Sequence, residues 1–378
     1  DNNRKVIVPD KWLQELFEIL ETYNFTIDEN SAFDEELSID PEMLGRIFEN
    51  LLAEINPETG ESARKSTGSY YTPRVIVDYM VDESLYLYLK NKTDIEEEKL
   101  RSLISYDLDD DTYTPLTHGE KEKIITAIDE LKILDPACGS GAFPMGALQK
   151  IVFILQQLDP NGQYWFKAQI KNVPVELRKN LEREHSEKNF DYIRKLGVIR
   201  RNIFGVDIQP IATEISRLRC FLTLIVDQKV DDDKDNRGID PLPNLDFKFV
   251  TANSLIGLPK TQIKGKVIPG ALKLYEDNTG IDELRDIREE YFGVKDLFER
   301  ETLKGKFKDI QKEMALNIFK GSYSGIADLT EALMNWDPFT HKQTSWFDIE
   351  WMFGIKEGVD IIIGNPPYNA NQLNENEN

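Results

Sequence analysis

An apolar segment that runs directly into a glycine-rich turn constrains the fold of this chain more than any other feature. Ile133-Leu134-Asp135 is followed by Pro136-Ala137-Cys138-Gly139-Ser140-Gly141, and then by a helical pattern over residues 143–158. Glycines allow a backbone to pass close to a ligand without Cβ clashes. In open α/β sheets, ligands bind at the carboxyl ends of the strands. The segment therefore predicts a buried strand, a ligand-contacting turn and a helix.

Three further apolar segments are separated from this one by helical patterns, which is typical of a doubly wound α/β sheet. Residues 203–206 lead to Asp207, residues 247–250 lead to Thr251-Ala252-Asn253-Ser254-Leu255, and residues 359–363 lead to Gly364. The last segment is continuously apolar apart from Asp360, and a glycine and two prolines mark its end, which indicates a buried parallel strand. The expected fold is a partial Rossmann-like α/β sheet, with strands up to this last segment.

The rest of the chain is expected to be largely helical. Residues 11–23 and 43–52 place apolar side chains on one helical face, so residues 1–66 are expected to form an N-terminal helical region. Residues 67–378 are expected to form the α/β domain, with helical insertions at about 160–200 and 260–345. A helix is expected after Pro73, and the polar, acidic residues 91–118 are expected to be an exposed insertion.

Composition excludes several classes of protein. No run of about 18 apolar residues exists, so no membrane-spanning helix is expected. Cys138 and Cys220 cannot form a disulfide framework, and the three histidines are scattered, so no metal site is expected and the cytoplasm is the simplest location. The net charge of −22 argues against a large nucleic-acid footprint on this chain, although a local basic groove is compatible with it.

The glycine turn does not fit the common phosphate-binding loops. A P-loop requires Lys and then Ser or Thr after its last glycine, where this chain has Ala142-Phe143, and the dinucleotide pattern requires a glycine where it has Pro144. Asp135 at the strand end suits a ligand with a cationic aminoacyl group, which Pro136, Ala137, Gly139 and Gly141 would also contact. The plain alternative is a tight strand-to-helix turn with no ligand.

A second carboxylate is expected to bind ribose hydroxyls of the same ligand. Asp159 lies near the distance at which dinucleotide sites carry an acidic residue, but it follows a helix, whereas Asp207 follows a strand. We therefore assign this role to Asp207, with Ile208 beside it; the alternative is a strand-end aspartate that caps the next helix. Asn253 and Ser254 follow the third strand. In related enzymes this place often carries an Asp that accepts a bond from the adenine amino group of the ligand, and the side-chain oxygen of Asn253 can also accept it; a helix-capping turn is the alternative.

The tetrapeptide Asn365-Pro366-Pro367-Tyr368 is the most specific chemical signal in the chain. Proline has a fixed φ and no N–H donor, so its neighbouring carbonyls can present acceptors in a rigid geometry. With the side-chain carbonyl of Asn365, they can bind both hydrogens of a planar amino group and orient its lone pair, while Tyr368 stacks on an extruded base. The alternative is a proline-rich turn in which Tyr368 packs against the fold.

Together these motifs resemble the N6-adenine DNA methyltransferases of the gamma arrangement, in which the cofactor motif precedes the catalytic motif. The turn from Asp135 to Gly141 resembles their S-adenosylmethionine motif, and Tyr71-Thr72-Pro73 resembles an upstream motif that packs over the methionine end of that cofactor. Residues 346–353 resemble the methylase part of type IIG restriction–modification enzymes. The resemblance covers roughly residues 40–370 and implies a Rossmann-like methyltransferase sheet, methyl transfer to adenine N6, and double-stranded DNA as the partner.

The chain also departs from this family. Pro9-Asp10 and Glu97-Glu98-Lys99 only approximate a nuclease core and lack flanking strands, so no nuclease is expected here. The strands and the target-recognition domain that follow the catalytic motif in the family are missing, so the chain is expected to be a fragment whose DNA-binding surface lies partly elsewhere. Two alternatives remain open: a protein glutamine N5-methyltransferase, which uses the same tetrapeptide on an amide, and a cofactor-binding fragment without turnover.

Overall fold

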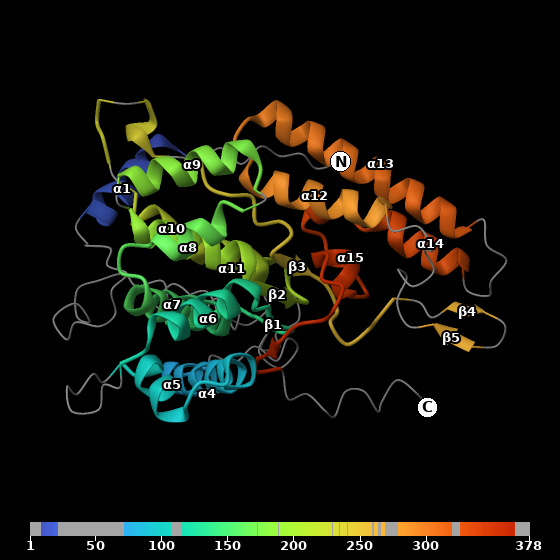
Figure 1. Ribbon diagram of the computed structural model, residues 1–378. Helices are drawn as coiled ribbons and strands as arrows, with labels where there is room; N and C mark the ends of the chain where they lie inside the picture. Colours follow the sequence, from blue (N-terminus) through green and yellow to red (C-terminus); the bar gives the residue numbers. More distant parts are fainter. Residues whose placement is uncertain are drawn as a thin grey trace, which may run out of the picture.

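The computed structural model describes a parallel β-sheet with helices on both of its faces (Figure 1). The residues that the structure describes are 9–21, 72–106, 115–171, 173–187, 189–228, 230–233, 235–239, 241–258, 261–263, 266–268, 279–319 and 326–366. The expected helix over residues 43–52 lies outside them. The four parallel strands have the order β3-β2-β1-β6 and comprise β1 (Ile133–Asp135), β2 (Ile203–Asp207), β3 (Phe249–Thr251) and β6 (Ile361–Ile362).

Strand β1 is central, because it pairs with β2 on one side and with β6 on the other. Ile133 is in register with Ile203 and with Ile361, so residues more than two hundred positions apart lie side by side. All of these pairs are parallel, as are those between β2 and β3. The carboxyl ends of all four strands therefore meet at one edge of the sheet, which confirms the expected α/β fold.

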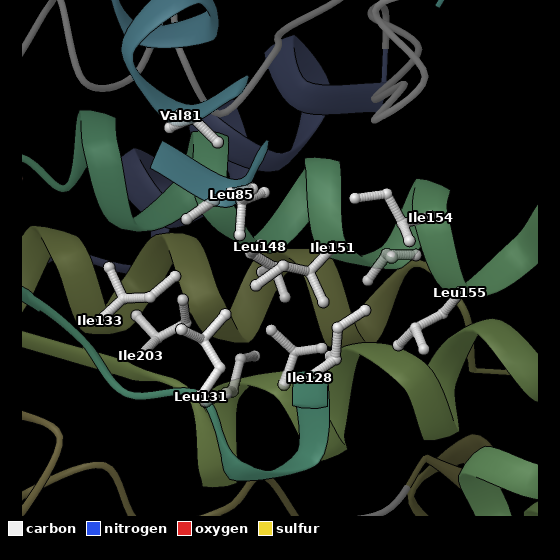
Figure 2. Close-up of a cluster of buried hydrophobic side chains, with 14 of the residues drawn as sticks. Val81, Leu85, Ile128, Leu131, Ile133, Leu148, Ile151, Ile154, Leu155 and Ile203 are labelled. Carbon is white, nitrogen blue, oxygen red and sulfur yellow. The ribbon is translucent and has the colours of Figure 1, made fainter. Parts of the chain in front are cut away.

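Alternate side chains of the strands enter two separate hydrophobic cores. Ile133, Ile203 and Ile361 belong to the first core, whereas the next residues on β1 and β2, Leu134 and Phe204, belong to the second. Figure 2 shows part of the first core, where Ile133 and Ile203 lie near Leu148 and Ile151. A sheet that is buried on both faces is covered by crossover helices, which is the physical basis of the doubly wound arrangement.

The first core is covered by helices that precede or connect the strands. The helix expected after Pro73 is α4 (Arg74–Thr93), and α6 begins with a capping box in which Thr117 and Glu120 satisfy each other's backbone N–H groups. The remaining helices of the first half are α1 (Asp10–Glu21), α5 (Glu97–Ile104), α6 (His118–Glu130), α7 (Ala142–Leu158), α8 (Gln163–Gln169), α9 (Val175–Ser186), α10 (Phe190–Arg201) and α11 (Pro210–Ile225).

The second core is formed by the long segment between β3 and β6. Its helices are α12 (Thr279–Gly293), α13 (Leu297–Phe319), α14 (Ile326–Asn335) and α15 (Ile349–Phe353), with a short 3-10 turn at Pro338–Thr340; another 3-10 turn, Asp235–Gly238, precedes β3. In Figure 1 the orange and red helices lie on the other side of the sheet from the green ones. This insertion was expected to be mostly helical, but it also contains an antiparallel hairpin, β4 (Thr261–Ile263) and β5 (Lys266–Ile268).

Two expectations about burial were wrong. Residues 91–118 are not simply an exposed insertion, because α5 buries Leu100 and Leu103 against the first core. The strand expected over residues 359–363 is only two residues long, and Ile362 is 69% exposed. β6 pairs with β1 alone among the described strands, so Ile362 lies at a sheet edge where no further described helix covers it. In the part of the chain described here, no helix is long and apolar enough to cross a membrane.

We expect Asn202, which immediately precedes β2, to stabilise the end of α6. This buried side chain donates to the carbonyl oxygens of Ile128 and Leu131, 2.6 and 2.7 Å away, and so satisfies the end of α6. Asn202→Ala leaves two buried carbonyls without these partners and should lower the free energy of unfolding by about 1–3 kcal/mol in denaturant titrations. The exposed Asn91→Ala on α4 is the control, with a change within about 0.5 kcal/mol; equal effects would refute this role.

Candidate active site

The sequence-predicted site residues that the structure describes gather at the carboxyl edge of the sheet. Asp135 ends β1, Asp207 ends β2, Asn253 follows β3, and Gly364 and Asn365 follow β6. Parallel pairing of the four strands brings these positions together although they span more than two hundred residues. Tyr71, Pro367 and Tyr368 lie outside the described residues.

The glycine turn after β1 folds back on the end of β2. The backbone N–H of Cys138 donates to the carbonyl oxygen of Val206 over 2.9 Å. Gly139 and Gly141 have φ values of 52° and 89°, a left-handed conformation that glycine adopts without strain. A Cβ on Gly141 would also lie 2.9 Å from Oγ of Ser216 on α11. The turn therefore requires glycine for both its backbone angle and its packing.

The Asp135 carboxyl is buried and only half satisfied. Its Oδ1 accepts a bond from the backbone N–H of Ala137 over 3.0 Å, whereas its buried Oδ2 has no hydrogen-bond partner among the described residues. Burial raises the pKa of Asp135 to about 8, in opposition to the Ala137 bond, and the neighbouring Asp207 carboxyl adds to the rise. An orphaned buried carboxyl oxygen is where a cationic ligand group would find an acceptor, so the site fits an aminoacyl ammonium.

The Asp207 carboxyl connects the ends of two strands. Its Oδ2 accepts from the backbone N–H of Gly139 over 2.9 Å, and its Oδ1 accepts from that of Gln209 over 2.8 Å. A carboxylate offers about four acceptor positions, so further acceptor capacity is left for a ligand hydroxyl. The rejected alternative, Asp159, instead accepts three backbone N–H bonds from the first turn of α8.

In the loop after β3, the side chain of Asn253 forms a turn, which is one of the two roles expected for this residue. The side-chain Oδ1 of Asn253 accepts from the backbone N–H of Leu255 over 3.1 Å, and Ser254 lies within this turn. The turn leaves Leu255 87% exposed, and Ile208 after β2 is also largely exposed. Exposed apolar side chains beside a polar site offer surfaces on which a planar ring can pack.

The segment after β6 lies directly against the glycine turn. A Cβ on Gly364 would lie 2.6 Å from Oδ1 of Asp135, so the Asp135 carboxyl leaves no room for a side chain at position 364. The side-chain Nδ2 of Asn365 donates to Oγ1 of Thr72 over 3.3 Å. The upstream motif at Thr72-Pro73 is therefore joined to the segment that carries the tetrapeptide, and the amide donor of Asn365 is occupied while its carbonyl remains an acceptor.

Helix α11 supplies supporting residues that the motif analysis missed. Ser216 donates to the carbonyl oxygen of Gly139 over 3.1 Å, and Arg219 donates to that of Ser140 over 3.0 Å. Thr213 shares a 2.9 Å hydroxyl contact with Thr251 at the end of β3. Residues 213, 216 and 219 recur at three-residue spacing, which places them on one helix face immediately after Asp207. Polar residues at this spacing on a buried helix were the sequence signal that could have predicted these supporting residues.

Metal-ligating side chains do not cluster here. Among the described residues, no group of three or more His, Cys, Asp or Glu side chains could hold a metal ion.

Comparison with known proteins relates this chain to restriction-modification methylases. Residues 201–378, which include Asp207, Asn253 and Asn365, match the family of the Eco57I restriction-modification methylase. The chain is also 30% identical over 249 residues to a Methanocaldococcus jannaschii protein named "Putative type II restriction enzyme and methyltransferase"; this match covers 64% of the chain and 18% of that protein. The resemblance to restriction–modification methylases that the motifs indicated is thereby confirmed.

We expect Asp135 to lower the stability of the ligand-free protein. The folded state holds a proton on Asp135 up to about pH 8, whereas the unfolded state releases it near 3.8, so unfolding is favoured as the pH rises between these values. Asp135→Asn lacks this penalty. Its free energy of unfolding should exceed that of the wild type by an amount that grows from about pH 4 to pH 8 and passes about 1 kcal/mol.

The same variant should lose affinity for a ligand with a cationic amino group, because the amide cannot supply a negative acceptor. Chemical denaturation at several pH values and calorimetric titration with S-adenosylmethionine measure the two effects. Asp94→Asn removes an exposed carboxylate instead and should leave ligand binding intact. A variant that is no more stable than the wild type at neutral pH would contradict the buried, protonated state.

We expect Gly364→Ala to separate the two strand ends. The new methyl group would meet the Asp135 carboxyl and also lie 3.4 Å from Cδ of Pro136, so one segment must shift. Overpacking of this kind costs about 1–3 kcal/mol of stability, and cofactor affinity should fall with it in calorimetry. Gly257→Ala is the matched control, because a Cβ there meets nothing within 4 Å. Equal behaviour of the two variants would refute the close approach.

Proposed function

We propose that the chain is the methyl-transfer module of a site-specific DNA methyltransferase that modifies adenine at N6, with S-adenosylmethionine as the methyl donor. One observation carries the proposal. The segment that bears Asn365 and Pro366 is in contact with both the glycine turn, through Gly364 and Asp135, and the upstream motif, through Thr72. The predicted cofactor and target residues therefore share one edge of the sheet, as methyl transfer requires.

The acceptors and apolar side chains of the site match the chemical groups of the cofactor one by one. The unpartnered Oδ2 of Asp135 would accept from its ammonium group, and Asp207 would accept from its ribose hydroxyls. Ile208 and Leu255 would flank the adenine ring, and the carbonyl of Asn253, which already accepts from Leu255, has a second lone pair for the adenine amino group. When bound, the cofactor supplies an electrophilic methyl group on a sulfonium.

The chain's own contribution to transfer is the positioning of the target amino group. The side-chain carbonyl of Asn365 and the backbone carbonyl of Pro366 would accept the two N–H bonds of adenine N6, which turns the nitrogen lone pair toward the methyl group. A nitrogen–carbon bond forms as the sulfur–carbon bond breaks, and the nitrogen then loses one proton to water. No strong base is required, because the nitrogen attacks before it is deprotonated.

DNA is the substrate that the family and the relative's name favour. The matched family is a restriction-modification methylase, and the Methanocaldococcus jannaschii relative is named as a restriction enzyme and methyltransferase. Since the chain spans 18% of that relative, the specificity of the whole enzyme depends on more than these residues. The Asn-Pro-Pro-Tyr tetrapeptide suits any planar amino or amide group, and the motifs upstream of it, at Tyr71-Thr72-Pro73 and at Asp135 to Gly141, favour adenine as the target.

We expect Asn365→Ala to abolish transfer with little effect on the fold. Loss of one oriented polar contact at the reacting group should lower the rate about 10²–10³-fold, while the affinity for S-adenosylmethionine changes far less. Incubation with methyl-labelled cofactor and mixed duplex DNA, followed by nucleoside analysis, should place the label on N6-methyladenine. Label on cytosine, or only on protein glutamine, would contradict the proposal. Asn91→Ala, exposed and on α4, is the control for activity.

A further inference from the structure

A cavity of about 700 Å³ lies at the opposite, amino edge of the sheet. Lys132 immediately precedes β1, Lys248 immediately precedes β3, and Arg200 and Arg201 end α10; all four line this cavity together with the segment that leads into β6. A volume of this size is within the range of small-molecule sites, roughly 300–1,000 Å³. The proposed methyl-transfer chemistry uses none of these residues.

The lining is cationic although the chain as a whole is acidic. Seven lysines and arginines line the cavity against four carboxylates, whereas the chain carries a net charge of −22. Lys92, Arg285 and Lys356 are at least partly exposed, and each is within 4 Å of an aspartate carboxylate. The local excess of positive charge therefore comes from the deeper groups.

Two of these deeper groups are ammonium groups without a carboxylate partner, on the buried Lys248 and the partly buried Lys132. Lys248 is 9% exposed; its Nζ donates to the carbonyl oxygen of Arg200 and lies 4.0 Å from the centre of the Phe204 ring. The Nζ of Lys132 donates to the carbonyl oxygen of Arg201 over 2.7 Å. Among the described residues, no carboxylate oxygen lies within the 4.0 Å of an ion pair from either nitrogen.

Burial without an ion pair is costly for a charged group. Burial is the main cause that lowers the pKa of Lys132 to about 8 and that of Lys248 to about 7. The neighbouring cations of this cluster contribute to the low pKa of Lys248. The buried Arg200 is nearby, where its guanidinium donates to Gln169 and stands 3.5 Å from a Glu289 carboxylate oxygen. An anion in the cavity would offset this concentration of positive charge.

We propose that this cavity binds a small phosphate-bearing anion, held by Lys132, Lys248 and Arg200. Two compact ammonium groups beside a guanidinium suit the several oxygens of a phosphate. The deep position of these groups favours a small ligand over a duplex, whose backbone would meet only the exposed rim. The cavity also opens at the sheet edge opposite Asn365, away from where a target base would enter. The proposal stands apart from methyl transfer, and either can fail without the other.

The lysines also have a structural role, and the experiment must separate the two roles. Both ammonium groups cap carbonyls at the carboxyl end of α10, which is favourable in itself. If capping were their whole role, phosphate would have no more effect on the protein than any other salt.

The test is thermal unfolding of the chain with orthophosphate as the probe and chloride at matched ionic strength as the reference. Binding to the folded state raises the Tm with phosphate concentration along a saturation curve, and calorimetry gives the Kd. Lys248→Met and Lys132→Met should each weaken phosphate binding roughly tenfold or more. Arg285 lines the same cavity but does not cap α10. The variant Arg285→Gln therefore tests the site even if a lysine variant fails to fold, and it should weaken phosphate binding several-fold.

The controls decide between outcomes. Lys123→Met removes an exposed cation of α6 outside the cavity and should bind phosphate as the wild type does. No Tm rise beyond that of chloride, or the same phosphate affinity in Arg285→Gln and Lys123→Met, would overturn the proposal. A short DNA duplex at equal phosphate concentration should not raise the Tm in the same way. If the duplex raised the Tm and orthophosphate did not, and Arg285→Gln removed the rise, the cavity would bind a DNA backbone and the small-anion proposal would be overturned.

Discussion

The pairing of β1 with β6 is the interaction on which the rest of the site depends. β6 is only two residues long, and its described partner is β1. The backbone N–H groups of Asp360 and Ile361 donate to the carbonyl oxygen of Lys132, and that of Ile363 donates to Leu134. Closing a loop of more than two hundred residues costs configurational entropy, although the cost grows only slowly with length. The helices α12 to α15 and their apolar core offset it, because they hold the intervening chain against the same sheet.

The two edges of this sheet have opposite electrostatic character. At the carboxyl edge, burial raises the pKa of both Asp135 and Asp207, and the neighbouring Asp207 carboxyl adds to the rise at Asp135. At the amino edge, Lys248 is buried and Lys132 is partly buried, and the pKa values of both are lowered. Parallel strands produce this separation naturally, since all of their beginnings meet at one edge and all of their ends at the other. A chain with a net charge of −22 therefore still has a concentrated cationic region.

Sequence patterns predicted the parts of the structure that depend on local rules. The strand-turn-helix at residues 133–158, the carboxylate at Asp207 and the helix after Pro73 each follow from short-range periodicity and punctuation, and the structure confirms them. The contact between Gly364 and Asp135, and the Ser216 bond to the turn, depend on tertiary packing that no local pattern specifies. The same reason explains the error at α5: charged residues dominate its composition, while Leu100, Leu103 and Ile104 reach the core. The basic cavity was missed because its lining residues come from six segments that are distant from one another in the sequence.

The position of Asn365 follows from how the short segment before it is held at both ends. At its start, Asp360 accepts from the backbone N–H of Lys132 over 2.9 Å, in addition to the backbone bonds there. At its end, Gly364 fits against Asp135 with no room for a side chain, and Asn365 donates to Thr72. Each of these anchors belongs to β1 or to the residues that flank α4, so the segment has little freedom to move relative to the glycine turn. A target group placed by Asn365 is therefore placed relative to Asp135, because one strand pair and two side-chain contacts fix both residues.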